Sequence, residues 1–250
     1  MNRFFIITVL IYFTGCSNSP SSKEQINEDV FSNTKVPELV VEEHNVYEVG
    51  YREIKIPKLS QDLDFIDKQY EHLIELFVPP TNGLVCGYIL NDEKYIFEQG
   101  SDDLLTKYAM VQFPKEYKTY DVTKEEFRIL ENQMKNMMSG DDLIDLTLTT
   151  QDILNERFEK LEFSDFNFEI GTPVQLGTLI KKDDVFGFGM ITPYQMLGNS
   201  ITKVMLCMLM RVNKRILFVY IYDDYKGKSE YKEIINLGED FADRLFMLNK

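Results

Sequence analysis

The chain is poor in the residues from which metal sites and nucleophilic active sites are built. Its 250 residues include only two histidines, His44 and His72, and three cysteines. These residues lie far apart in the sequence and do not show the close spacing of zinc ligands. No G-x-S-x-G motif is present, so the turn that carries a hydrolase serine has no candidate. We therefore predict no metal site and no cofactor, and the residues indicate no catalytic constellation.

Positive charge is also scarce. Lys and Arg number 27 against 41 Asp and Glu, which gives a formal net charge of −14. Nucleic-acid binding depends on basic side chains that neutralise phosphates. Adsorption to anionic lipid headgroups depends on the same side chains. The composition therefore argues against nucleic acid as a partner and against purely electrostatic attachment to a membrane.

The apolar run that opens the chain is too short to span a bilayer. It covers residues 4–13 (FFIITVLIYF), about half of the roughly 20 apolar residues that a transmembrane helix needs. Arg3 precedes the run, and the small residues Thr14 and Gly15 follow it, just before Cys16. A basic start, an apolar centre and small residues at the end are typical of a secretory signal. The sequence predicts a signal peptide over residues 1–15.

The tetrapeptide Phe13-Thr14-Gly15-Cys16 resembles the lipobox of bacterial lipoproteins, with Phe13 in place of the usual Leu. The resemblance implies cleavage between Gly15 and Cys16 and attachment of acyl chains such as palmitate to Cys16. Two or more chains anchor a protein firmly, whereas one does not. Ser17 resembles the sorting signal for the outer membrane, which implies its periplasmic or surface face rather than the inner membrane. An ordinary signal peptide and an uncleaved anchor remain open as alternatives.

The segment after Cys16 has the composition of a linker. Residues 17–46 begin with Ser, Asn and Pro and then become acidic, with little periodicity before Val36. Such segments favour a flexible tether. Without residues 1–15 the chain loses only Arg3 among its charges and has a formal net charge of −15. We predict an acylated cysteine and tether over residues 16–46, and a single globular domain over residues 47–250.

In the first half of that domain, strands and short helices are mixed. Thr123 and Glu126 fit a capping box at the start of a helix that Ser139-Gly140 would end. The segment 143–148 is ambiguous between strand and helix. The other expected elements are a strand over 47–56, a helix over 62–76, strands over 83–90, 94–98 and 108–113, and a helix over 150–161.

The last third contains the clearest structural signal. Two long apolar runs, residues 203–212 and 215–222, flank Asn213-Lys214 and predict a β-hairpin of central strands. An amphipathic helix is expected over 229–248. Shorter strands are expected over 163–174, 178–181 and 185–192. The order of elements favours an α+β fold with a mostly antiparallel sheet, helices packed on it, a closing β-hairpin and a C-terminal helix.

The body also resembles the PsbP-like α/β/α sandwich. The features that carry this resemblance are Val78-Pro79-Pro80 before the expected strand at 83–90, and the hairpin RVNKRILFVYIY followed by a helix that ends at Leu248-Asn249. The resemblance implies a fold and a non-enzymatic role in assembly, and it transfers no functional residue.

Acidic pairs are the most frequent chemical motif, and each falls in an expected turn. Asp bonds to nearby backbone in turns, so we favour a structural role over acid–base or Ca²⁺ chemistry. The run Tyr220–Tyr225 (YIYDDY) could line a ligand mouth, although a solvated strand end is favoured. Methionines over 190–210 and the glycines of residues 185–189 (VFGFG) are expected in ordinary strands. The acidic pairs are Asp102-Asp103, Asp141-Asp142, Asp183-Asp184 and Asp223-Asp224.

The two remaining cysteines leave a choice open. Cys86 and Cys207 lie in apolar runs and are candidates for a disulfide, while buried free thiols are the favoured alternative. The leading hypothesis for function is a lipid-anchored envelope protein that acts as a non-catalytic binding or assembly module, with the membrane and an envelope protein or ligand as partners. An envelope hydrolase with a carboxylate site, and a thiol-redox or disulfide-stapled domain, are the alternatives.

Overall fold

A computed structural model describes residues 43–99, 104–137, 142–160, 168–196 and 199–250. These residues form one compact unit. Helices labelled η are short 3-10 helices. The elements are β1 (His44–Val49), β2 (Arg52–Pro57), β3 (Leu63–Phe65), η1 (Lys68–Tyr70), α1 (Glu71–Glu75), β4 (Asn82–Leu90), η2 (Asn91–Glu93), α2 (Lys94–Gln99), β5 (Tyr108–Pro114), η3 (Lys115–Tyr117), α3 (Lys124–Met137), α4 (Asp142–Lys160), β6 (Phe168–Ile170), β7 (Val174–Lys182), β8 (Val185–Met196), β9 (Asn199–Val212), β10 (Arg215–Asp224) and α5 (Lys228–Leu248).

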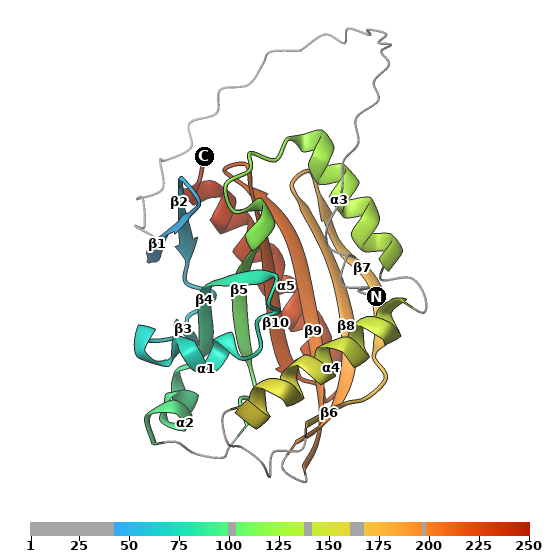
Figure 1. Cartoon of the computed structure of the whole chain (residues 1–250). Helices are drawn as coiled ribbons and strands as arrows, with labels where there is room; N and C mark the ends of the chain where they lie inside the picture. The colour runs from blue at the N-terminus through green and yellow to red at the C-terminus, as the bar shows by residue number, and fades with distance from the viewer. Residues whose placement is uncertain (1–42, 100–103, 138–141, 161–167, 197–198) are drawn as a thin grey trace, which may run out of the picture. The chain divides into compact units, whose positions relative to one another are not determined.

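The central feature of the fold is a large sheet in the order β3-β4-β5-β10-β9-β8-β6, with β7 also paired to β8. Every pair of neighbouring strands is antiparallel. Helix α5 lies behind this sheet in Figure 1, and α3 and α4 lie in front of it. The expected α+β class, with a mostly antiparallel sheet and helices packed on it, is confirmed.

The β9–β10 hairpin lies at the centre of the sheet, as the sequence predicts. Its register pairs Arg215 with Val212 and Asp224 with Lys203. The turn residues Asn213 and Lys214 both have positive φ, 47° and 64°. Two positive φ values are characteristic of a type I′ turn, whose twist matches that of the two strands. The turn therefore sets the register along the full length of the hairpin.

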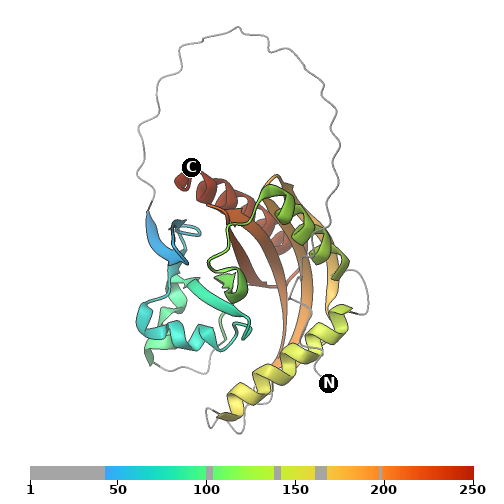
Figure 2. The same cartoon turned by 45° about the horizontal axis from the view of Figure 1, so that its top comes forward.

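Side chains of this hairpin alternate between two buried faces. On one face, Leu217 and Val219 join the cluster covered by α5. On the other face, Ile216 packs with Phe127 of α3. Burial of each such side chain contributes about 1.5–3 kcal/mol. The sheet therefore has a hydrophobic layer on each side, and Figure 2 shows the helices on both sides of the curved strands.

The start of helix α3 is the one that the sequence predicts, at Thr123. The capping box is confirmed, because the Glu126 backbone N–H donates to Thr123 Oγ1 at 3.2 Å and the Thr123 N–H donates to Glu126 Oε2 at 2.8 Å. The ambiguous segment 143–148 belongs to α4. Helix α5 lies close to β9 at Gly238, where a Cβ would come within 2.3 Å of Leu206 Cδ2.

The strand expected over 47–56 is in fact a hairpin, and the folded body starts earlier than residue 47. Gly50 has φ +67°, and an added Cβ would lie 2.2 Å from the Lys118 carbonyl oxygen. The chain turns at Gly50-Tyr51, so β1 and β2 form a separate two-stranded sheet. The tether boundary at 46 is therefore wrong, because β1 already begins at His44.

Two further predictions are wrong because β4 pairs with strands that lie far from it in the sequence, β3 on one edge and β5 on the other. The expected helix over 62–76 is replaced in part by β3, where Leu63 pairs with Leu90, and only Glu71–Glu75 is α-helical. The expected strand over 94–98 is helix α2. Since β3 and β5 occupy both edges of β4, a strand over 94–98 would have no free edge there.

Arg215 connects the small sheet to the large one. Its side chain is 2% exposed, and Nε donates to the Val49 carbonyl oxygen at 3.1 Å. Nη1 donates to the Tyr120 carbonyl oxygen at 2.7 Å and pairs with Asp121 at 2.6 Å. Arg52 binds the other oxygen of Asp121 at 2.6 Å. Hydrogen bonds from Arg52 and Arg215 hold the pKa of Asp121 at about 2, below its usual value.

We predict that Arg215→Met lowers the free energy of unfolding by about 3 kcal/mol, because two carbonyl groups lose their donor and Asp121 loses a partner. Arg52→Met is the matched control, since it removes the same charge from the same carboxylate at a half-exposed position. Its cost should stay below about 1 kcal/mol. Urea unfolding followed by circular dichroism measures both values. Equal losses in the two variants would contradict the role assigned to Arg215.

Candidate functional site

Several residues singled out in the sequence lie outside the described part of the chain. They include Gly15, Cys16, the signal peptide over 1–15, and the tether as far as residue 42. Asp102-Asp103 and Asp141 also fall there. His44 belongs to β1 and not to the tether. His72 is exposed on α1, as expected of a surface residue.

The described acidic pairs hold basic side chains in place. Asp184, in the turn between β7 and β8, pairs with Arg211 Nε at 2.7 Å. Asp223 is 8% exposed and pairs with Lys107 at 2.7 Å. Asp224 accepts a hydrogen bond from Lys203 at 2.5 Å. These carboxylates therefore have structural partners.

The run Tyr220–Tyr225 is neither an open ligand mouth nor a solvated strand end. Tyr222 stacks on Tyr108 with ring centroids 4.6 Å apart, and Tyr220 stacks on Tyr222 at 6.5 Å. Burial raises the pKa of Tyr220 and Tyr222 well above the usual value. The aromatic rings thus form a packed ladder on one face of the sheet.

Lys203 closes the end of this ladder. Its side chain is only 4% exposed. Its ammonium donates to the carbonyl oxygens of Leu105 and Thr106, at 2.6 and 2.9 Å, in addition to Asp224. With three acceptors for three N–H donors, the buried charge is fully hydrogen-bonded. The cluster fixes the segment before β5 to the ends of β9 and β10.

The methionines and the glycine-containing run lie in strands, as expected. Met205, Met208 and Met210 are buried in β9. Gly187 and Gly189 lie within β8, where the strand passes close to β7 side chains such as Ile180 and Leu179. The run is therefore part of the sheet and not a phosphate-binding loop.

Among the described residues, Cys86 and Cys207 are free and buried. Their strands are separated by β5 and β10. At the usual strand spacing this is about 14 Å, whereas a disulfide needs Cα atoms within about 7 Å. The thiols also belong to hydrophobic clusters on opposite faces of the sheet. Cys86 and Cys207 therefore do not form a disulfide in this fold, and the alternative of a disulfide-stapled or thiol-redox domain built on this pair is wrong.

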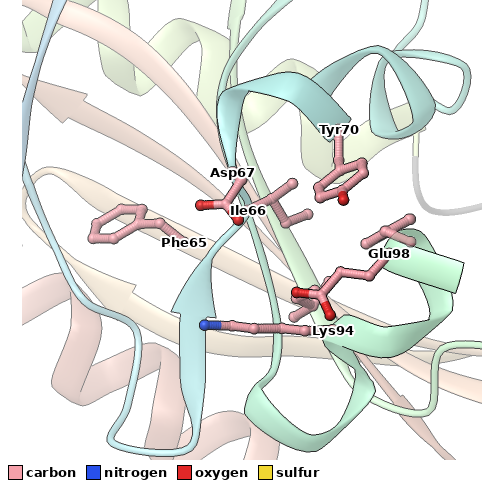
Figure 3. A pocket seen from close by; sticks show the side chains of 8 residues that line it. Phe65, Ile66, Asp67, Tyr70, Lys94 and Glu98 are labelled. Carbon is pink, nitrogen blue, oxygen red and sulfur yellow. The ribbon is translucent and has the colours of Figure 1, made fainter.

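A small hollow lies between α2 and the chain that follows β3. Figure 3 shows Asp67 and Glu98 on two sides of it, with Lys94 and the ring of Tyr70 close by. The cavity volume is about 10 Å³, on the order of one water molecule. We call it the β3–α2 hollow. Its apolar lining is Phe65, Ile66, Ile89 and Phe97.

Around the β3–α2 hollow, some charged side chains form ion pairs and others do not. Lys94 pairs with Asp64 at 2.6 Å, and Lys58 binds the other oxygen of the same carboxylate. These hydrogen bonds, from Lys58 and then Lys94, lower the pKa of Asp64. Asp67 and Glu98 are exposed, and within the described ranges no basic side chain pairs with either. The hollow therefore combines two unpaired carboxylates with an apolar floor.

Sequence reasoning missed the β3–α2 hollow. It is formed by Asp67 and Tyr70, from a region expected to be one helix, and by Phe97 and Glu98, from a region expected to be a strand. In the described ranges, no group of three or more His, Cys, Asp or Glu side chains is placed to hold a metal ion. No helix in these ranges is long and apolar enough to cross a bilayer.

Comparisons with known proteins add no functional assignment to this geometry. The chain matches no protein-family model and no curated protein. The Ran-binding protein Mog1p of Saccharomyces cerevisiae is similar with a TM-score of 0.29 and 14% identity, over 84% of this chain and 93% of that one. A mutant of protein Mog1 gives a TM-score of 0.30 and 13% identity, over 83% and 93%. Such weak likeness carries no argument, so the resemblance to PsbP-like sandwiches stays a prediction.

We predict that neither Cys86 nor Cys207 reacts with Ellman's reagent in the folded protein, because burial raises both thiol pKa values, that of Cys86 to about 12. The full chain with Cys16→Ala should give no reactive thiol when native and two in guanidinium without reductant. Two silent thiols in guanidinium would show a disulfide, and one reactive thiol in the native protein would contradict the burial.

Proposed function

We propose that this chain is a lipid-anchored bacterial cell-envelope protein whose folded body is a non-catalytic binding or assembly module. The observation that carries the proposal is Phe13-Thr14-Gly15-Cys16 at the end of an apolar run too short to span a bilayer. Acyl chains on Cys16 supply the membrane attachment that a chain with a net charge of −15 after cleavage does not gain from anionic lipid. The outer membrane, on its periplasmic or surface face, is the proposed location.

The start of the folded body supports this reading. The first strand begins at His44, which leaves residues 17–42 between Cys16 and the described body. We propose that this segment acts as the tether between the acyl chains and the body, as the composition of residues 17–46 predicts.

The placement of the acidic groups supports binding rather than hydrolysis. Asp184, Asp223 and Asp224 each pair with a basic side chain, so they stabilise turns and strand ends. The β3–α2 hollow holds about 10 Å³, whereas small-molecule sites usually hold about 300–1,000 Å³.

An envelope hydrolase is the second candidate, and one observation favours it. Asp67 and Glu98 both line the β3–α2 hollow, and glycoside hydrolysis uses a pair of carboxylates. The discriminating experiment measures the release of soluble sugars from purified cell-wall polymer. Release that Asp67→Asn abolishes would replace the binding module with the hydrolase.

Metabolic labelling with a palmitate analogue tests the anchor. We predict that the wild-type protein is labelled and sediments with membranes, and that Cys16→Ala is unlabelled because the acceptor sulfur is gone. Cys86→Ala is the matched control, since it removes a buried thiol and should leave labelling within about twofold of the wild type. Equal labelling of wild type and Cys16→Ala, or no labelling of either, would refute lipidation at Cys16.

A further inference from the structure

The outer edge of strand β1 has the geometry of an interface between two copies of this chain. Figures 1 and 2 both show β1 at the periphery of the body. We propose that β1 pairs antiparallel with β1 of a second copy, about a two-fold axis at Val46, so that two β1–β2 sheets join into one sheet of four strands. The proposal goes beyond the lipid anchor, and it stands if Cys16 is not acylated.

The outer edge of β1 carries backbone groups without partners. Lys55 of β2 lies opposite Val46, and its N–H and carbonyl oxygen both bind the Asn249 side chain, at 2.9 and 2.7 Å. These two groups of Lys55 therefore point away from β1, and the alternation of an antiparallel pair makes those of Val46 and Glu48 point away from β2. Within the described part of the chain, these outward groups of Val46 and Glu48 form no hydrogen bond.

The other edges of the two sheets are capped, short or irregular. β2 is capped by Asn249 and by Asn213, which donates to the Glu53 carbonyl oxygen at 3.3 Å. β3 and β6 have three residues each, and β7 contains two register shifts and ends at Lys181-Lys182. Short strands, bulges and lysines prevent pairing at an exposed edge. β1 has six residues in continuous register, without lysine or proline, so its edge is suited to pairing with another strand.

The sequence of β1 is self-complementary about Val46. An axis at this residue places Val46 opposite its own copy and His44 opposite Glu48 of the second copy. Val46 is 53% exposed, so the pairing removes an apolar side chain from water and places an imidazole across from a carboxylate. An axis at Tyr47 would place each Val46 opposite a carboxylate. An axis at Glu48 would place two carboxylates opposite each other, which is destabilising.

The segment that precedes β1 in the same chain fits this edge less well. To pair with Val46 it would have to reverse direction at Glu42-Glu43, whereas two-residue hairpin turns favour Gly, Asn or Asp. The Glu43 carbonyl oxygen also accepts a hydrogen bond from the Lys58 N–H at 3.0 Å, which continues the pairing of β1 with β2. A second copy is therefore the occupant that the edge favours.

Disulfide trapping tests the pairing, with the full chain carrying Cys16→Ala in detergent micelles. Opposite residues of the proposed pair have Cα atoms about 5.5 Å apart, within the range of a disulfide. We expect Val46→Cys to form a covalent dimer on mild oxidation with copper phenanthroline, measured by non-reducing electrophoresis. Lys55→Cys is the matched control, because it is exposed beside Val46 but lies about 14 Å from its own copy. It should give about tenfold less dimer.

A mixture of two single variants tests the register. With the axis at Val46, His44 of one copy faces Glu48 of the other, and each of these residues lies about 14 Å from its own copy. His44→Cys and Glu48→Cys should therefore stay monomeric when oxidised alone and form the covalent dimer when mixed. A dimer that forms equally from either variant alone would contradict the two-fold axis.

A proline tests the hydrogen bonds of the edge. Added to Val46→Cys, Glu48→Pro should lower the yield of dimer about fivefold or more, because it removes an outward N–H and leaves the pairing with β2 intact. Glu48→Ala removes the same carboxylate but keeps the N–H, so its yield should stay within about twofold. An unchanged circular dichroism spectrum confirms that Glu48→Pro folds. No dimer from Val46→Cys, as much dimer from Lys55→Cys, or equal yields with Glu48→Pro and Glu48→Ala would overturn the proposal.

Discussion

The β9–β10 hairpin must bury both of its faces, and the rest of the body is arranged around that constraint. Successive residues of β10, such as Leu217 and Phe218, point to opposite faces of the sheet and pack in two different hydrophobic clusters. A one-residue slip would exchange the two sets and place tyrosine hydroxyls in the layer under α5. The turn at Asn213-Lys214 prevents that slip, because its positive φ values close the hairpin in one register. Helices α5 and α3 then cover one face each.

Four basic side chains, of which Arg215 and Lys203 are buried, connect separate segments of the body by hydrogen bonds to backbone carbonyl groups. Arg215 holds the carbonyl groups of Val49 and Tyr120, and Lys203 holds those of Leu105 and Thr106. Arg157 on α4 donates to the Leu76 and Val78 carbonyl oxygens, and Arg244 on α5 donates to those of Lys58 and Leu59. Each cation satisfies backbone acceptors that the strands and helices leave unpaired. These four side chains, of the 27 Lys and Arg in the chain, therefore have a structural role.

Local signals in the sequence predicted the elements that depend on local interactions. The hairpin turn, the Thr123 capping box and the amphipathic α5 were all found because each depends on neighbouring residues. The β3–α2 hollow was not found, because it depends on the long-range pairing of Leu63 with Leu90. That pairing outweighs the helical spacing of the apolar residues over 62–76. The separation of Cys86 from Cys207 likewise depends on strand order, which spacing in the sequence does not encode.

The central claim is that a self-contained body is linked to the membrane only through the N-terminal segment. Limited trypsin digestion of sealed, right-side-out membrane vesicles that display the protein tests it most directly, since Lys23 and Lys35 are the basic residues between Cys16 and the body. We predict release of a soluble fragment that starts after one of these lysines and melts at the same temperature as the intact protein. A cleaved fragment that still sediments with the membrane, or one that unfolds on release, would contradict the claim.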